Sequence, residues 1–366
     1  MKINILSPGR FHVLDLAREL DKNGFDVKFY SFVPTKRALQ FGLPKRCSFS
    51  LFICMSPFLA LCRFLKGAKW TVQLRIWIQD RLTSIVMRKC DVLIAMSGDF
   101  VYSVKIAKQN GSIIVIERGS KHILEQKRIL ESIPSLQNTK PVPDANVLRE
   151  LSSYQLADYV SVASLHVKRS FLLNHYLDNK IFVNPYGVDL SKFYPIACEK
   201  QIDVIMVGAW SYQKGADLLL DVIRDLKIQF LHVGAIVDVP FIEDMYCHHH
   251  EPVDQNKLVE FYNQAKIFIL PSRQEGLAMV QAQAIACNLP IVGSPDSGAE
   301  DLQKMVQFPE FITLIKDYTF ESVKSAITDA LCNYEKLNGI LYAGNAIENL
   351  SWEAYGKRYA QFLKSL

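Results

Sequence analysis

Residues 271–292 read Pro-Ser-Arg-Gln-Glu-Gly-Leu-Ala-Met-Val-Gln-Ala-Gln-Ala-Ile-Ala-Cys-Asn-Leu-Pro-Ile-Val, and this stretch decides the fold. It follows an apolar run, Ile267–Leu270, that predicts a buried strand. A polar turn comes next, and the residues of Leu277–Cys287 predict a helix. A further strand is expected at Pro290–Gly293. A strand, a helix and a strand in this order are typical of parallel α/β layers.

The same alternation covers the rest of the chain and restarts once, between Tyr194-Pro195 and Gln201. The other expected strands are Lys2–Leu6, Phe25–Ser31, Asp91–Ala95, Ser112–Ile116, Tyr159–Val162, Ile181–Asn184, Gln201–Val207 and Gln229–Val233, and the other expected helices are Phe11–Asn23, Val147–Leu156, Gly215–Asp225 and Asn256–Gln264. Two series of similar size predict an α/β protein with two Rossmann-like domains, residues 1–195 and 196–351, that face a central cleft. The amphipathic stretch Trp352–Leu366 is expected to form a closing helix that packs back on the first domain.

Composition and charge agree with two folded domains that have different partners. The chain has 366 residues, of which 49% are hydrophobic and 22% charged, and these values exclude disorder, collagen and coiled coil. The net charge of +5 divides into +13 over residues 1–195 and −8 over residues 196–366. A basic first half is typical of proteins that meet phosphorylated substrates, nucleic acid or an anionic membrane.

Targeting and membrane-spanning segments are not expected. The chain opens directly on a strand-like run, Met-Lys-Ile-Asn-Ile-Leu, which differs from a signal peptide. The longest uncharged apolar stretch, Cys47–Cys62, is shorter than the roughly 20 residues that a spanning helix needs. The eight cysteines form no Cys-x-x-Cys pair, which predicts buried free thiols in a reducing cytoplasm.

Polar turns follow several of the expected strands of the second domain. Arg273, Glu275 and Gly276 lie in the turn before the helix of the opening stretch, Lys214 follows Gly208 after another strand, and Gly298 lies in the loop Ser294–Glu300. Because carboxyl ends of parallel strands meet at one edge, these loops are expected to form one site. Amide groups at helix starts and a lysine favour phosphate, and Glu275 is suited to accept hydrogen bonds from sugar hydroxyls. The alternatives are a helix-capping role for Glu275 and a solvated turn for Lys214.

Two loops of the first domain are candidates for the opposite wall of the cleft. Ser7–His12 joins the first strand to its helix and contains Gly9, and Val115–His122 gathers Arg118 and His122 at the end of another strand. We expect the glycine and the helix-start amides of the first loop to face the cleft. The alternative for the second loop is a positively charged surface turn.

Together these segments are similar to the retaining glycosyltransferases of the GT-B fold, in the large group 1, or family-four, type. The matching residues are Gly208, Lys214 and Gly215, then Glu275 and Gly276, then Gly298 and Glu300, with further matches at 157–164, 184–195 and 351–352. The resemblance implies a nucleotide-sugar donor site in the second domain and an acceptor site in the first. It also implies transfer with retention at the anomeric carbon, without a metal ion or another cofactor.

The resemblance also implies roles for single residues. Lys214 would stabilise the leaving diphosphate, Glu275 would orient the sugar ring, Gly9 would lie near the donor phosphate, and either Arg118 or His122 would lie against the transferred sugar. Two positions depart from the family pattern.

Ala209 stands where the family has a diphosphate-binding arginine, and Gln283 stands where a second glutamate binds the ribose. Nucleotide binding is still expected, because a glutamine donates and accepts hydrogen bonds. Arg273 is predicted to replace the lost positive charge.

Residues 35–90 contain eleven Lys and Arg residues but a single acid, Asp80, and these alternate with aromatic and aliphatic residues. This mixture predicts contact with an anionic bilayer surface. Nucleic acid is disfavoured, since no binding module surrounds the stretch. A basic, solvated rim over a buried strand and helix is the alternative.

Two other features are expected to be structural. Residues 247–251 read Cys-His-His-His-Glu, but on a strand their side chains alternate between faces, and we predict no metal site there. Leu277 and Met279 are expected in the core.

The sequence therefore predicts a cytoplasmic glycosyltransferase, peripheral on the inner face of the membrane, that extends a lipid-linked glycan in bacterial surface polysaccharide assembly. The alternatives are a sugar-nucleotide epimerase of the same fold and a non-catalytic subunit. A hydride-transferring enzyme is disfavoured, because no Gly-x-Gly-x-x-Gly follows the first strand.

Overall fold

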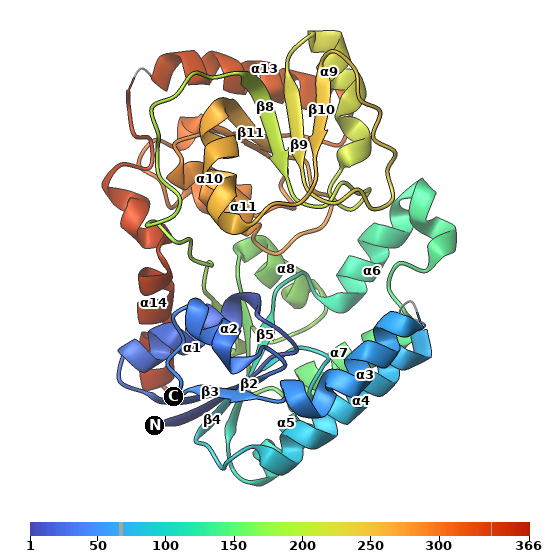
Figure 1. The fold of residues 1–366 in the computed structure, drawn as a ribbon, viewed down its shortest axis with the longest axis vertical. Coiled ribbons are helices and arrows are strands. Elements are labelled where there is room, and N and C mark those ends of the chain that lie inside the picture. The colour runs from blue at the N-terminus through green and yellow to red at the C-terminus, as the bar shows by residue number, and fades with distance from the viewer. Residues whose placement is uncertain (66–68, 338) are drawn as a thin grey trace.

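The computed structural model describes residues 1–65, 69–337 and 339–366 and contains two domains, each built on a parallel β-sheet (Figure 1). The sheet of the first domain consists, in spatial order, of β3 (Ser48–Ser50), β2 (Asp26–Ser31), β1 (Lys2–Leu6), β4 (Val92–Met96), β5 (Ile113–Arg118), β6 (Tyr159–Val162) and β7 (Ile181–Val183). Its helices are α1 (Phe11–Lys22), α2 (Thr35–Gln40), α3 (Phe52–Phe64), α4 (Lys69–Val86), α5 (Val101–Gln109), α6 (Ile123–Ser132), α7 (Asp144–Leu156) and α8 (Leu165–Leu173).

The second domain repeats this plan with six strands. In spatial order they are β10 (Cys247–His250), β9 (Phe230–Val233), β8 (Ile202–Val207), β11 (Ala265–Leu270), β12 (Ile291–Gly293) and β13 (Ile312–Leu314). The helices are α9 (Leu220–Leu226), α10 (Gln255–Gln264), α11 (Met279–Ala286), α12 (Ala299–Gln303) and α13 (Phe320–Leu337). The predicted α/β fold with two Rossmann-like domains is confirmed.

Each sheet has a point at which the strand order reverses. In the first domain the reversal lies between β1 and β4, where Leu6 pairs with Ala95, and in the second it lies between β8 and β11. The central strands are buried on both faces, which explains their continuous apolar sequences. Ligands of such sheets bind at the carboxyl ends of the strands, beside the reversal.

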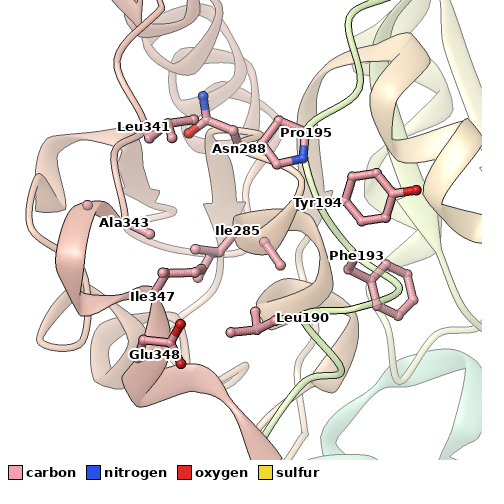
Figure 2. Close-up of a pocket in the computed structure, with 12 residues that line it drawn as sticks. Leu190, Phe193, Tyr194, Pro195, Ile285, Asn288, Leu341, Ala343, Ile347 and Glu348 are labelled. Carbon is pink, nitrogen blue, oxygen red and sulfur yellow. The ribbon is translucent and has the colours of Figure 1, made fainter.

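The chain crosses between the domains twice. It leaves β7 for β8, and after α13 it returns through a 3₁₀ turn, Gly344–Leu350, to α14 (Trp352–Lys364). At the crossing an apolar pocket of about 250 Å³ has walls from both connections, with Leu190 and Phe193 on one and Ile347 on the other (Figure 2).

Helix α14 packs against α1 of the first domain (Figure 1). A Cβ on Gly356 would lie 2.3 Å from the Cβ of Glu19, so the backbone of α14 lies directly against the Glu19 side chain of α1. The hydroxyl of Tyr359 donates a 2.7 Å hydrogen bond to the buried carboxylate of Glu117.

Several local expectations differ from the structure. The sequence missed β3 and β13, strands of three residues each, which are too short for a periodic pattern. Helix α11 begins at Met279, so Glu275 lies in the preceding loop and does not cap the helix. Met279 was expected in the core but is 39% exposed, because it lines a cleft between the domains.

The cysteines and the basic aromatic segment, residues 35–90, differ from the sequence expectations only in part. The expectation of buried thiols holds for Cys47, Cys247 and Cys287 but is wrong for Cys54, Cys198 and Cys332, which are exposed. Residues 35–90 fold as α2, β3 and a hairpin of α3 and α4, and Lys66 of this segment lies outside the described residues. Among the helices of the described part of the chain, none combines the length and the hydropathy that a membrane span requires.

Candidate functional site

The loops after β8 and β11 meet at the carboxyl edge of the second sheet. The ammonium nitrogen of Lys214 contacts Oε2 of Glu275, and only 20% and 19% of the two side chains is exposed. Burial lowers the pKa of Lys214 to about 8. The lysine is therefore charged at neutral pH, and its ion pair with Glu275 is held in a partly desolvated site.

Backbone contacts fix these two loops to each other. Gly215 has a φ of +72°, and a Cβ there would lie 2.2 Å from the carbonyl oxygen of Pro271. The amide of Arg273 donates to the carbonyl of Gln213 at 2.9 Å. The positive φ and the close approach to Pro271 both require a glycine after Lys214. The turn that Gly215 forms places the lysine beside Glu275.

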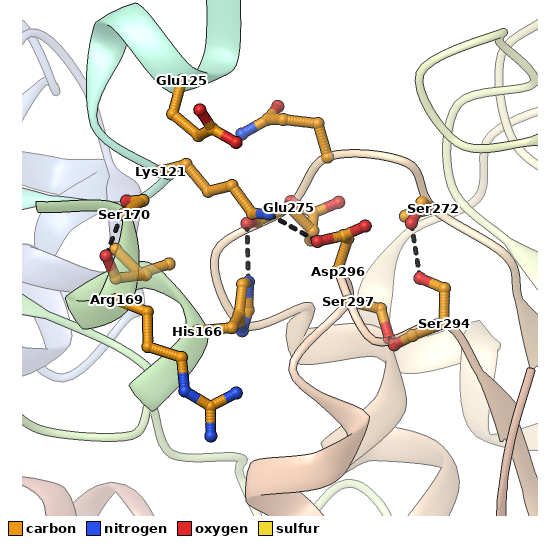
Figure 3. A network of polar contacts seen from close by, with 12 residues as sticks. Lys121, Glu125, His166, Arg169, Ser170, Ser272, Glu275, Ser294, Asp296 and Ser297 are labelled. Carbon is orange, nitrogen blue, oxygen red and sulfur yellow. Dashed lines mark hydrogen bonds and ion pairs between the residues drawn. The ribbon is translucent and has the colours of Figure 1, made fainter. Parts of the chain in front are cut away.

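The first domain contacts the loop of Glu275 directly (Figure 3). Nε2 of His166 lies 3.1 Å from the carbonyl oxygen of Glu275, and the hydroxyl of Ser164 donates to the carbonyl of Gly276 at 3.0 Å. A Cβ on Gly276 would lie 2.1 Å from the carbonyl oxygen of Gly119. The loop 118–121 after β5 therefore rests against the Glu-Gly turn.

A second bridge between the domains lies beside this contact. The ammonium of Lys121 contacts a carboxylate oxygen of Asp296 (Figure 3). The hydroxyl of Tyr318 donates to the other oxygen at 2.6 Å. The amide of Gln274 donates to the hydroxyl of Ser120. The loop after β5 thus meets the loops after β11, β12 and β13 of the second domain at one place.

Arg273 forms an ion pair with Asp217 of its own domain. Its guanidinium donates to both oxygens of Asp217, at 2.5 and 2.9 Å, and to the carbonyl of Tyr212 at 2.8 Å. It lines an open hollow together with Lys121 and Asp296. The role predicted for Arg273 in donor binding stays a prediction.

Gln283 lies in a cleft of about 380 Å³ between the domains. Its side-chain oxygen accepts a 3.0 Å hydrogen bond from the hydroxyl of Tyr262. The second domain lines the cleft with Met279, Leu258, Val253, Gln255 and Val280, and the first domain lines it with Arg10 and Phe11. The cleft therefore combines an apolar wall with a few polar groups, which is typical of ligand sites.

The glycines predicted for the site take different places. Gly9 lies in the loop before α1, where its carbonyl accepts from the hydroxyl of Ser7 at 2.8 Å, and Phe11 beside it has a strained φ of +23°. Gly208 directly follows β8 and has a φ of +131°, and its carbonyl accepts from Nε2 of His232 at 2.8 Å. Gly298 has a φ of +86° and precedes α12, packed under Leu277.

Arg118 and His122 both point into the first domain. The guanidinium of Arg118 is buried and donates to Glu150 at 2.7 Å. The imidazole of His122 packs edge-on against Phe171, and burial together with Arg118 lowers its pKa to about 4. The loop between them, and neither side chain, faces Glu275.

The histidine-rich segment forms strand β10, as predicted. Nδ1 of His232 lies 2.9 Å from Nδ1 of His249. His248 and His250 are exposed, whereas Cys247 is buried and His249 half-buried, so exposure alternates along the strand. No group of three or more metal-binding side chains occurs among the described residues.

Several contacts of the site were missed from the sequence. His166 and Ser164 hold the Glu275 loop, and Nε2 of His12 lies 2.9 Å from the carboxylate of Glu117 at the wall of the cleft. A serine before a helix and an acid at a strand end were available signals. Their partners lie more than 100 residues away, which local patterns do not reveal.

Comparison with known proteins agrees with this geometry. Residues 201–333 match the family model described as glycosyl transferases group 1. A probable sucrose-phosphate synthase of Thermosipho melanesiensis is 23% identical over 220 residues, which cover 52% of this chain and 50% of that protein. The amylovoran biosynthesis glycosyltransferase AmsD of Erwinia amylovora is 28% identical over 153 residues, which cover 38% of this chain and 44% of that protein. The chain thus spans about half the length of these relatives.

Solved structures are similar over the whole chain. The sucrose-phosphate synthase of Thermosynechococcus elongatus superimposes with a TM-score of 0.68 at 16% identity, covering 100% of this chain and 98% of that one. Anabaena HepE in complex with UDP-glucose gives a TM-score of 0.68 at 12% identity, covering 100% of both chains. Residues 201–333 are therefore similar to glycosyl transferases group 1, in a chain whose two domains together have the GT-B fold.

Proposed function

We propose that the protein transfers a sugar from a nucleotide-sugar donor to a glycan acceptor, with retention at the anomeric carbon and without a metal ion or another cofactor. The observation that carries this proposal is the contact between Lys214 and Glu275 at the carboxyl edge of the second sheet. A cation beside a sugar-binding carboxylate, next to a cleft of nucleoside size, is suited to hold a sugar diphosphate.

The donor would bind across both domains. The cleft at Gln283 would take the nucleoside, with the glutamine on the ribose and Met279 and Leu258 against the base. The diphosphate would reach toward Lys214 and the loop of Gly9, and the sugar would lie against Glu275. HepE, whose fold this chain shares, was solved with UDP-glucose, so a uridine donor is the first to test.

The proposed transfer makes one bond and breaks one on the same face of the sugar. The bond from the anomeric carbon to the diphosphate breaks, the acceptor hydroxyl attacks that carbon, and the leaving diphosphate takes the hydroxyl proton. Lys214 stabilises the negative charge that develops on the diphosphate, while Glu275 orients the ring.

We place the acceptor on a lipid at an anionic membrane, which the hairpin of α3 and α4 would contact. Ile53, Leu61 and Phe64 lie on one face of α3, and Ile53 and Phe64 are 85% and 83% exposed. Trp70 and Trp77, two turns apart on α4, are 58% and 57% exposed.

Exposed aromatic residues of this kind prefer the interface of a bilayer. Basic residues surround them on the hairpin, including Arg63 and Arg81, and each contributes about 1 kcal/mol at an anionic surface. The hairpin lies along one side of the first domain, with α4 against α5 (Figure 1). This proposal would make the enzyme peripheral on the inner, cytoplasmic face of the membrane.

A role in surface polysaccharide assembly, lipopolysaccharide included, is supported by the similarity to AmsD, whose name refers to amylovoran biosynthesis. A non-catalytic subunit is the second candidate, because Ala209 leaves Lys214 without a basic partner and Arg273 is engaged by Asp217. Titration calorimetry with UDP, GDP and ADP separates the two. Binding of one nucleotide, lost in Lys214→Met, supports the enzyme, and no binding of any of them would overturn it.

A further inference from the structure

A polar pocket of about 280 Å³ lies in the first domain, apart from the Lys214–Glu275 pair. It opens at the carboxyl ends of β4 and β5, between α4 and α7. Its polar lining consists of Ser97, Asp99, Arg118, Gln126, Asn146, Arg149 and Glu150, and its apolar lining includes Val72 and Ile76.

Both guanidinium groups of the pocket are fixed by hydrogen bonds. Arg118 donates to Glu150 at 2.7 Å, to Gln126 at 2.5 Å and to the carbonyl of Lys121 at 3.0 Å. Arg149 donates to the carbonyl of Gly98 at 3.0 Å and to Asn146 at 2.7 Å. The donors are thus held in place before any ligand arrives.

Asp99 is the exception in this network. Its carboxylate has no hydrogen-bond partner among the residues that the structure describes, although its neighbours Gly98 and Arg149 both form hydrogen bonds. Burial and the nearby carboxylate of Glu150 raise the pKa of Asp99 to about 6. An unpaired carboxylate in a half-buried pocket costs stability, and a ligand that donates to it would remove that cost.

We propose that this pocket binds a sugar residue of the acceptor, with Asp99 accepting hydrogen bonds from its hydroxyl groups. Two carboxylates and two guanidiniums make the pocket nearly neutral, which disfavours a phosphate or a cation as ligand. Neighbouring hydroxyls of a sugar donate to carboxylates and accept from guanidinium and amide groups, and this lining offers all three. Val72 and Ile76 supply an apolar wall for the C–H face of the ring.

The position of the pocket agrees with an acceptor site. This proposal rests on the proposed function. The side chain of Arg118 lines the pocket, while the residues that follow it, Gly119 and Ser120, contact Gly276 and Gln274. One loop therefore separates the pocket from the proposed site of transfer. Helix α4 turns Ile76 inward and Trp77 outward, so a sugar attached to a lipid would enter beside the hairpin.

Saturation-transfer NMR on the full chain tests the proposal with methyl glycosides of glucose, galactose and N-acetylglucosamine. We expect at least one glycoside to give a signal that persists in excess UDP, since the pocket is separate from the nucleoside cleft. Asp99→Ala should weaken its binding at least tenfold. The control Asp178→Ala removes an exposed carboxylate of the same domain, paired with Lys168, and should change nothing.

The thermal midpoint distinguishes a binding role from a structural one. Because Asp99 has no partner in the empty pocket, Asp99→Ala and Asp99→Asn should leave the midpoint unchanged or raise it, whereas a structural carboxylate would lower it. Absence of signal from all three glycosides, or equal signal in wild type and Asp99→Ala, would overturn the proposal. UDP binding is measured separately, so a failure of the donor site would be seen on its own.

Discussion

Gly276 and Gly119 meet backbone to backbone across the two domains. A Cβ added to Gly276 would lie 2.1 Å from the carbonyl oxygen of Gly119 and 2.8 Å from its carbonyl carbon. The backbones of the Glu275 loop and of the loop after β5 are therefore in direct contact, with no room for a side chain between them. This contact sets how the domains approach each other around the proposed donor site.

Gly276→Ala should separate these loops, because neither backbone can yield to a methyl group. We expect transfer from UDP-sugar to fall at least tenfold, and the radius of gyration measured by small-angle scattering to rise. Gly119→Ala is the matched comparison, since its Cβ would meet only the hydroxyl of Tyr186 at 3.2 Å, and its effect should be smaller. Equal activity of Gly276→Ala and wild type would show that this contact is not needed.

The affinity for UDP should depend on the charge of Lys214. Its pKa of about 8 means that the lysine loses its proton as the pH rises through that value. UDP affinity measured by calorimetry should therefore fall about tenfold between pH 7 and pH 9. Lys214→Arg keeps its charge over this range and should remove the dependence, whereas the same fall in Lys214→Arg would assign it to another group.

Arg273 and Asp217 test the replacement of the missing arginine. If Arg273 supplies the charge that Ala209 lacks, Arg273→Ala should reduce UDP affinity at least tenfold. Asp217→Asn leaves the guanidinium in place but removes its counter-ion, and should keep or increase the affinity. Unchanged UDP binding in Arg273→Ala would limit Arg273 to its ion pair with Asp217.

The parts that were predictable depend on local patterns. Central strands such as β8 and β11 are continuous apolar runs, and the turns after them carry Lys214 and Glu275. The fold and the position of these two residues at one sheet edge therefore followed from the sequence, whereas their direct contact did not. The orientations of the Arg118 and His122 side chains were harder to predict. They depend on contacts with Glu150 of α7 and Phe171 of α8, which are distant in the sequence. The exposure of Met279 depends on the gap between the domains, which no single helix encodes.

Acid should destabilise the protein partly through His232. Burial lowers its pKa from 6.5 to about 4, so the unfolded chain binds more protons between these values. The free energy of unfolding should therefore fall by up to about 3 kcal/mol from this residue as the pH drops from 6.5 to 4.

Urea unfolding at several pH values measures this fall, and His232→Gln should make it smaller. The control His175→Asn changes an exposed histidine with a φ of +63°, which asparagine accepts, and should keep the wild-type slope. An unchanged slope in His232→Gln would contradict the assignment.

The hairpin of α3 and α4 should carry binding to membranes. Replacing Trp70 and Trp77 together by alanine removes its two exposed indoles, and flotation with anionic liposomes at low salt should fall several-fold. Replacing Leu173 and Leu177, which are exposed elsewhere on the first domain, should have no effect. If the wild-type protein does not float at low salt, the membrane proposal is wrong.

The packing of α14 has a consequence for biosynthesis. Gly356 and Tyr359 complete the wall of the first domain at Glu19 and Glu117, yet the ribosome adds them only after the whole second domain. The first domain cannot reach its final packing until the whole second domain has been translated. During synthesis the surface of α1 that α14 covers therefore stays exposed. A chain that stops before Trp352 would keep it exposed and be a target for chaperones and proteases.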